Sequence, residues 1–216
     1  MIQNPVRRQV LLAAVIIALA ALLWASASLH ATFIDALQFS KDYVESQPLV
    51  SRLAFVVLAA LSAMLVLFSS IAVVPVAVYA WGQGETLLLL TGGWFLGANL
   101  AYLIGHLFGR RATLFFVPAE TLDHYAELLS VRMSVAEVAL LKLALPSEMP
   151  SFALGIMRYP LTKFWPVLLA SELPFALWAV YLSAALIENR FAAFVAVLLA
   201  GLAVAAVIGR RLLRRR

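Results

Sequence analysis

Residues 134–160, SVAEVALLKLALPSEMPSFALGIMRYP, decide the fold. Ser134 and Glu137 form a capping box, so we expect a helix to begin near Val135 and to end before Pro146. Such a helix has about eleven residues and rises about 16 Å, which is half of a bilayer core of about 30 Å. After the turn that ends at Pro150, the chain is apolar again up to residue 157. Two half-length pieces around a double-proline turn are typical of a re-entrant hairpin, whose broken backbone requires a protein or wet cavity around it.

The composition places this hairpin in a membrane protein. The chain has 216 residues, of which 64% are hydrophobic and 12% are charged. An ordinary soluble domain is about 45–50% apolar and about 25% charged, and a disordered chain needs low hydrophobicity, so both classes are excluded. The sequence contains no cysteine. That absence excludes disulfides, thiolate nucleophiles and thiolate metal sites.

Four or five apolar stretches are long enough to cross the membrane, which takes about 20 residues. They are residues 10–29, an overlong 53–84, 86–108, 164–186 and 191–209. The first stretch has a second interpretation, because Arg7 and Arg8 precede it and a small-residue site ends it. It could therefore be a secretory signal that is cleaved.

Charge sets the expected orientation. Residues 31–52, which we expect to form a loop, carry more acidic than basic groups and suit the outside. Arg110, Arg111 and the arginine-rich tail suit the cytoplasm and face anionic headgroups. An odd number of crossings must then separate Arg52 from Arg110.

Length alone would allow two crossings there, so part of residues 53–84 should enter and leave by the same face. Ser69, Ser70, Pro75 and the Gly82–Gly84 turn favour this interpretation by interrupting the apolar run. The alternative is a plain extra span over residues 53–74, which would place Arg7 and Arg8 outside.

The expected architecture is an all-α polytopic membrane protein with about four full transmembrane helices and two facing re-entrant hairpins, an inverted repeat. Pro75 and Pro146 each precede a glycine by nine residues, and paired interruptions indicate a transport site. With Pro150, these prolines mark the hairpin turns. We divide the chain into residues 1–52, the membrane domain 53–190 and residues 191–216, with both termini inside. Residues 118–133 read as an amphipathic surface helix.

A glycine-rich stretch adds a family resemblance. Residues 93–110, GWFLGANLAYLIGHLFGR, resemble the glycine-rich helix of VTT-domain proteins, also called the DedA or SNARE-associated family. The second half is also similar, in its spacing of Pro146, Phe152, Gly155, Arg158, Phe164, Pro174 and Tyr181.

Two features depart from the family pattern, which covers roughly residues 53–182. Ser69 and Ser70 stand where a proline–glycine pair is expected, and Leu140 and Leu143 replace an arginine and a proline, with Lys142 as a possible stand-in. The resemblance implies facing re-entrant hairpins and movement of lipids between leaflets. In eukaryotic members this is phospholipid scrambling, and in bacterial members it is carrier-lipid recycling and membrane homeostasis linked to the proton gradient.

Five residues are candidates for transport or headgroup contact: Glu148, Glu172, Lys142, Arg158 and His106. Ionisable groups inside an apolar segment cost about 2.5–3.5 kcal/mol on insertion scales and usually face a cavity or a partner. The alternatives are structural: Glu148 could pair with Lys142, Glu172 could satisfy the helix defect at Pro174, and Arg158 could extend its charge to the interface. His106 could sense pH or lie at the interface.

Small residues recur at every fourth position of the glycine-rich stretch and predict close helix packing. They are Gly93, Gly97, Ala101, Gly105 and Gly109. The same stripe could form a homo-oligomer or a lipid groove. Asn99 is expected to hydrogen-bond to another helix.

No enzyme motif, metal-ligand spacing or phosphate-binding loop is present, so we expect no enzyme, no cofactor and no metal. The expected partners are membrane lipids, not nucleic acid. We therefore predict a flippase or scramblase of phospholipid or isoprenoid-phosphate carrier lipid, with or without coupling to protons, in the bacterial cytoplasmic (inner) membrane. The alternative is a membrane scaffold that acts through its glycine-rich helix.

Overall fold

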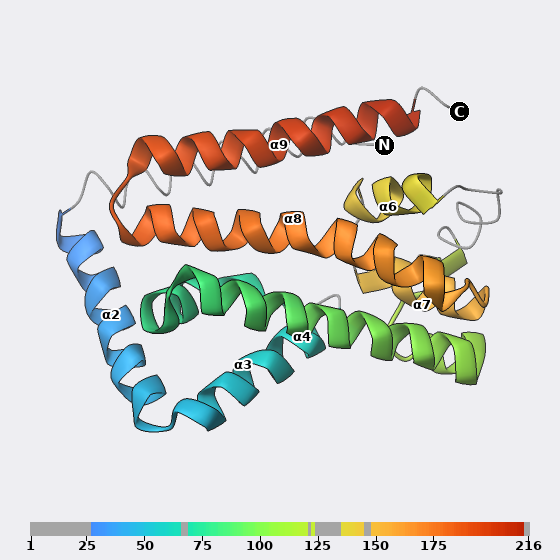
Figure 1. The fold of residues 1–216 in the computed structure, drawn as a ribbon, viewed down its shortest axis with the longest axis horizontal. Helices are drawn as coiled ribbons and strands as arrows, with labels where there is room; N and C mark the ends of the chain where they lie inside the picture. Colours follow the sequence, from blue (N-terminus) through green and yellow to red (C-terminus); the bar gives the residue numbers. More distant parts are fainter. Residues whose placement is uncertain (1–26, 66–68, 121, 124–134, 145–147, 214–216) are drawn as a thin grey trace. The chain divides into compact units, whose positions relative to one another are not determined.

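The computed structural model describes residues 27–65, 69–120, 122–123, 135–144 and 148–213, and every regular element within them is helical. Figure 1 shows these elements. They are α2 (Ala27–Ser46), α3 (Pro48–Ser62), the 3-10 turn η1 (Ser70–Val73), α4 (Val74–Thr113), α6 (Val135–Ala144), α7 (Glu148–Ile156), α8 (Leu161–Ile187) and α9 (Phe191–Leu213). The expected all-α class is confirmed for this part of the chain.

Two of these helices are long and apolar enough to cross a membrane, Ser70–Thr113 and Leu161–Ile187. The count rises to three if Ala31–Ser46 and Pro48–Ser62 are taken as one span. The predicted spans 86–108 and 164–186 fall within the first two helices. The predicted span 191–209 lies in α9, whose described apolar part is Phe191–Gly201.

Residues 31–52, which we expected to form an external loop, are helical and form α2 and the start of α3. Its charged residues support a helix: Lys41 and Glu45 form an ion pair one turn apart, with 3.5 Å between Nζ and Oε1. Leu37 is buried. The only break between the two helices lies just before Pro48, where a proline suits a helix start.

Of the interruptions expected within residues 53–84, the one at Ser69 and Ser70 lies at the end of the gap between α3 and η1, whereas the one at the glycines does not end a helix. Helix α3 ends at Ser62 and the chain resumes regular structure at Ser70, whereas α4 begins at Val74 and continues past Gly82 and Gly84. Gly82 has a φ of 78°, so the backbone leaves regular helical geometry there although the helix assignment continues. The Gly82–Gly84 segment therefore bends α4 and does not end it.

The helical parts of the expected second hairpin are present. Helix α6 spans Val135–Ala144, close to the predicted start and end, and α7 follows from Glu148 to Ile156. With ten and nine residues, neither is long enough to cross a bilayer core of about 30 Å. Pro150 lies in the first turn of α7, and Pro75 lies in the first turn of α4, so both prolines begin helices.

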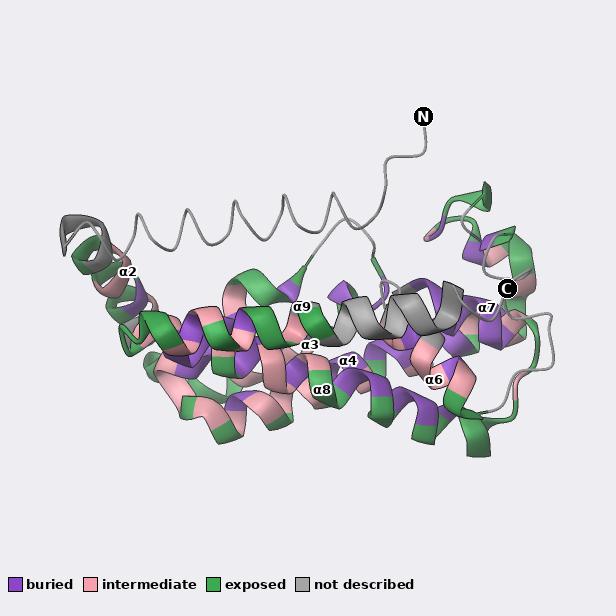
Figure 2. Ribbon diagram, turned by 90° about the horizontal axis from the view of Figure 1, so that it is seen from above, coloured by how far each residue is buried: buried purple, intermediate pink, exposed green. Residues whose placement is uncertain are grey.

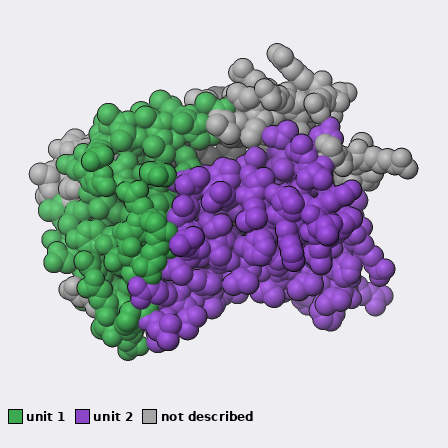
Figure 3. Space-filling model, viewed as in Figure 1, with its two compact units in different colours: residues 1–48, 73–86, 178–216 green, residues 49–72, 87–177 purple. Residues whose placement is uncertain are grey.

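The chain forms two compact units (Figure 3). Unit 1 comprises residues 1–48, 73–86 and 178–216, and unit 2 comprises residues 49–72 and 87–177. In unit 1, the end of α8 packs on α9 through Ala185, Phe194 and Leu198, with Trp178 beside them. Figure 2 shows exposed and buried residues alternating along the helices.

Several predictions lie outside the described residues. They are most of the first span (residues 10–29), Pro146, and most of the expected surface helix, whose residues 121 and 124–133 are not described.

Candidate functional site

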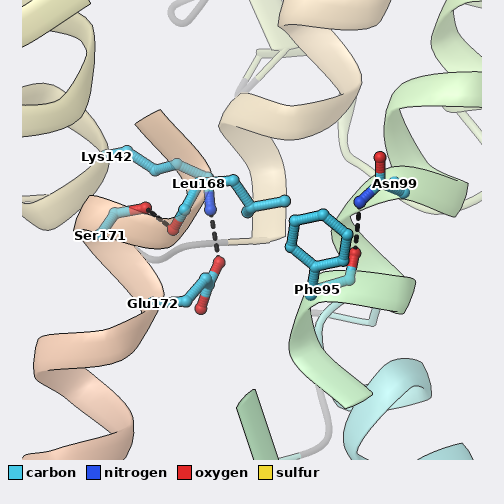
Figure 4. A network of polar contacts seen from close by, with 6 residues as sticks. All are labelled: Phe95, Asn99, Lys142, Leu168, Ser171 and Glu172. Atoms are coloured by element: carbon cyan, nitrogen blue, oxygen red, sulfur yellow. Dashed lines mark hydrogen bonds and ion pairs between the residues drawn. The ribbon is translucent and has the colours of Figure 1, made fainter. Parts of the chain in front are cut away.

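Unit 2 contains a buried ion pair between two helices. Lys142, in the last turn of α6, donates to Glu172 of α8, with 2.5 Å between Nζ and Oε1. The side chains are 0% and 2% exposed, respectively. Figure 4 shows the two side chains meeting between their helices. The sequence singled out both residues but did not predict that they pair.

The pattern of burial along α8 shows that Glu172 lies on the inward face of the helix. Phe164, Val167, Leu168 and Ser171 are buried with Glu172, whereas Trp165, Leu169 and Leu173 are exposed. The buried set recurs at intervals of three and four residues, which defines one face of a helix. The carboxylate therefore points into the protein, and the opposite, apolar face remains uncovered.

Pairing makes these two charges tolerable in an apolar interior. A buried ion loses several kcal/mol of hydration, and an opposite charge with good geometry offsets much of this loss. Removing one partner of such a pair costs about 3–5 kcal/mol, because it leaves an uncompensated charge. The pair holds α6 against α8 and keeps a titratable group inside the protein.

Helix α4 has two contrasting faces in unit 2. The small residues Gly93, Gly97, Ala101 and Gly105 are buried. On the other side, an exposed apolar stripe runs along the helix, formed by Leu96, Leu100, Leu103 and Leu107. An exposed leucine stripe suits contact with lipid chains, so α4 faces protein with its small residues.

The glycines of the buried face are in close contact with two other helices. A Cβ on Gly97 would lie 2.1 Å from the carbonyl oxygen of Ala60 in α3, and a Cβ on Gly105 would lie 2.3 Å from that of Phe152 in α7. Gly155 of α7 meets α4 in the same way, 2.1 Å from the Tyr102 oxygen. A Cβ on Gly109 would contact nothing within 4 Å, but the residue has a φ of 66°. Glycine is therefore favoured there by the backbone conformation and not by close packing.

A neutral polar chain lies where α3 gives way to η1. The indole Nε1 of Trp94 donates to Ser70 Oγ at 3.0 Å, and the Ser70 and Ser62 hydroxyls are 2.9 Å apart. Ser62 in turn donates to the Ala59 carbonyl at 2.8 Å. All three side chains are buried, and each hydroxyl proton has an acceptor. The sequence marked Ser70 as a departure from a family pattern but missed its partners.

Aromatic groups surround the end of α7. The Tyr102 hydroxyl donates to the Tyr159 carbonyl at 2.5 Å, and the Tyr102 ring stacks on His106 with centroids 5.6 Å apart. The Nδ1 atom of His106 is buried without a hydrogen-bond partner. The His106 ring of α4 is thus half-buried against Tyr102 of the same helix.

Arg158 ends α7 in an unusual backbone conformation. Its φ is 55°, and the amides of Arg158 and Tyr159 donate to the carbonyls of Gly155 and Leu154, both at 2.9 Å. These two bonds form a Schellman motif, in which glycine is the usual residue at the left-handed position. The exposed Arg158 side chain is therefore held at a fixed turn before α8.

Two further polar contacts involve α4. Asn99 accepts a hydrogen bond from Trp165 Nε1 of α8 at 3.0 Å, as the expected bond to another helix. At the end of α4, Arg110 Nη2 donates to Asp123 Oδ2 at 3.0 Å. The hydrogen bond to Arg110 holds the pKa of the Asp123 carboxyl below its ordinary value.

Sequence comparison identifies this helical arrangement. A family model described as the VTT domain matches residues 55–185. The chain belongs to the VTT-domain family. The match covers more than half of the chain and confirms the resemblance inferred from the glycine-rich helix. No curated protein and no solved structure is significantly similar to the chain.

The matched VTT domain contains the ion pair, the glycine contacts and the hydroxyl chain. Lys142, which stands near the family's expected arginine, supplies the cation of the pair. Glu148 is the first residue of α7, but its side chain lies outside what the structure describes. The described parts of this VTT protein contain no group of three or more metal-ligating side chains.

Membership in this family and the long apolar helices make the chain an integral membrane protein.

Proposed function

We propose that this VTT-domain protein moves lipid headgroups across the membrane, and that the Lys142–Glu172 pair is the polar centre of the path. The observation that carries the proposal is the full burial of this pair between a half-length helix and a spanning helix. Charged groups inside apolar segments of membrane proteins are associated with substrate and proton paths. The family's members are commonly regarded as transporter-like, which supports the same class of function.

The chemistry of the pair suits a phosphate-bearing headgroup. When a phosphate approaches Lys142, it can replace the carboxylate as partner of the ammonium group, and Glu172 can then take up a proton and remain neutral. The reverse exchange releases the phosphate and the proton. This cycle couples headgroup passage to protonation without leaving an uncompensated charge in the apolar interior.

Two further groups fit the path. Arg158 offers a fixed, exposed cation at the turn before α8 and is proposed to attract the phosphate. Glu148 begins α7 and stays a candidate for headgroup or proton contact. In this proposal α6–α7 and the segment from α3 to α4 form the two re-entrant hairpins. Four full transmembrane spans complete the fold. The protein lies in the cytoplasmic membrane.

The scaffold alternative is less well supported by the packing of the glycines. Gly93, Gly97 and Gly105 are covered by α3 and α7 of the same chain. A stripe that is filled within the chain is not free to bind a second protein.

The test is translocation of labelled lipid in proteoliposomes, at two pH values, with a phospholipid and an isoprenoid phosphate as substrates. We expect wild-type protein to exceed empty liposomes, and Glu172→Gln to lose most of the rate and its pH dependence. Glu120→Gln is the matched control, because Glu120 is exposed. A wild-type rate equal to that of empty liposomes for both lipids would refute the proposal.

A further inference from the structure

Unit 1 contains a pocket that the proposed path does not use. Its volume is about 250 Å³, and its lining includes Tyr79 and Gln83 of α4 and Glu188 after α8, together with Val78, Gly82, Ala184 and Ile187. Pockets for drug-sized ligands measure about 300–1,000 Å³, so this one suits a small polar group and not a whole lipid.

Two backbone positions with positive φ lie in the pocket lining or next to it. Gly82 lines it and has a φ of 78°, a conformation that L side chains rarely adopt. Asn189 has a φ of 55° and ends α8 in a tight turn, where the Arg190 amide donates to the Ala185 carbonyl at 2.9 Å. This turn directly follows the lining residue Glu188 and fixes the backbone beside it.

Glu188 is the one charged residue that the described lining of the pocket contains, and it contacts Arg190, with 3.1 Å between Oε2 and Nε. A cation lies next to the lining residue Tyr79: Lys41, which also contacts Glu45. The Lys41 ammonium also lies 5.7 Å from the centre of the Tyr79 ring. An anion in the lining and a cation beside it complement a zwitterion better than a net anion.

The pocket also distinguishes between kinds of ammonium. The Glu188 carboxylate and the Gln83 amide oxygen accept hydrogen bonds, which a primary ammonium can donate and a quaternary ammonium cannot. Quaternary ammonium groups favour an open aromatic face, and the Tyr79 face already has Lys41 over it.

We infer that this pocket is a binding site for a zwitterionic group with a primary ammonium and a phosphate, as in phosphoethanolamine. Glu188 and Gln83 hold the ammonium, and Lys41 holds the phosphate. As a headgroup site the inference rests on the proposed lipid transport and adds headgroup selection to it. The orientation expected from the arginine clusters places the turn between α8 and α9 on the outer side, so the site would select lipids of the outer leaflet.

The test measures binding, by native mass spectrometry of the full chain in detergent. The lipids are phosphatidylethanolamine, phosphatidylcholine and phosphatidylglycerol with identical acyl chains. We expect wild type to bind the ethanolamine lipid most tightly. Glu188→Gln should weaken that binding about tenfold, as expected for loss of one charged hydrogen bond, and should leave the choline lipid unchanged.

Arg190→Gln is the decisive control. It breaks the same ion pair as Glu188→Gln but leaves the carboxylate at the pocket, so the preference for ethanolamine should be retained. Equal loss in both variants, or equal binding of the three lipids by wild type, would overturn the inference. Gln83→Leu provides a second, uncharged test if Glu188→Gln does not fold, and it should also reduce the preference.

Two further experiments distinguish a lipid headgroup from free phosphoethanolamine as the ligand, and distinguish the pocket from the proposed transport. Soluble phosphoethanolamine that displaces the lipid at similar concentrations would identify the free compound as a ligand, and its failure to compete would identify the lipid. In proteoliposomes, Glu188→Gln should change headgroup preference while translocation continues. If wild type translocates nothing yet retains selective binding, the proposed transport fails and the pocket stands.

Discussion

Unit 2 buries polar side chains in two places, at the break after α3 and at α6, and the two places satisfy these side chains with different chemistry. At the break after α3, Trp94, Ser70 and Ser62 form a neutral chain in which each donor has an acceptor. At α6, Lys142 and Glu172 meet as ions. A hydroxyl chain satisfies polar groups and cannot change its net charge near neutral pH. The ion pair places two full charges in the interior, so the proposed transport chemistry is assigned to the α6 side.

Breaking the ion pair should have the largest effect on stability. Glu172→Gln leaves the Lys142 ammonium buried without its counter-ion, and we expect a loss of about 3–5 kcal/mol in the free energy of unfolding. Lys142→Met should cost a similar amount. The double variant Lys142→Met/Glu172→Met should recover most of the loss, because no charge remains buried. Unfolding in detergent, followed by temperature or denaturant, measures all three.

Substitutions at the close contacts of α4 should cause the second-largest loss of stability. They should do so both at α3 and at α7. Gly97→Ala places a Cβ 2.1 Å from a backbone oxygen of α3, and Gly155→Ala places one equally close to α4. Overpacking of this kind costs about 1–3 kcal/mol. Gly92→Ala is the matched control, because nothing lies within 4 Å of its new Cβ. If all three variants have the same unfolding temperature, the close packing is not a source of stability.

The neutral chain should respond more weakly than the ion pair. Trp94→Phe removes the indole donor to Ser70 but leaves the bond between the Ser70 and Ser62 hydroxyls. The expected loss is about 1 kcal/mol, and translocation should continue. A loss of translocation without a larger loss of stability would assign function to the α3 side and would reverse the comparison.

A substitution in the turn after α7 should change the free energy of unfolding least, and should raise it. Arg158→Gly replaces a left-handed arginine by the residue that this position favours, so stability should rise by up to about 1 kcal/mol. If the cation attracts phosphate, the translocation rate should nevertheless fall. Arg158→Asn, which tolerates the same conformation, tests whether the missing charge is responsible.

Much of this fold could be predicted from local signals. The capping box at Ser134 and the prolines gave α6 nearly to the residue, and the apolar run before Ile187 gave α8. The helical structure of residues 31–52 was not predicted, because charge was weighed only as a sign of orientation although Lys41 and Glu45 also support a helix. Partners far apart in the chain, such as Lys142 with Glu172 and Trp94 with Ser70, depend on tertiary packing, which no local pattern encodes.

The comparison between Lys142→Met/Glu172→Met and wild type tests the central claim most directly. The measurement is the initial rate of labelled-phospholipid translocation in proteoliposomes, with unfolding measured on the same preparations. The account predicts a double variant that is about as stable as wild type but translocates at the rate of empty liposomes. A double variant that translocates at the wild-type rate would show that the pair only holds the helices together.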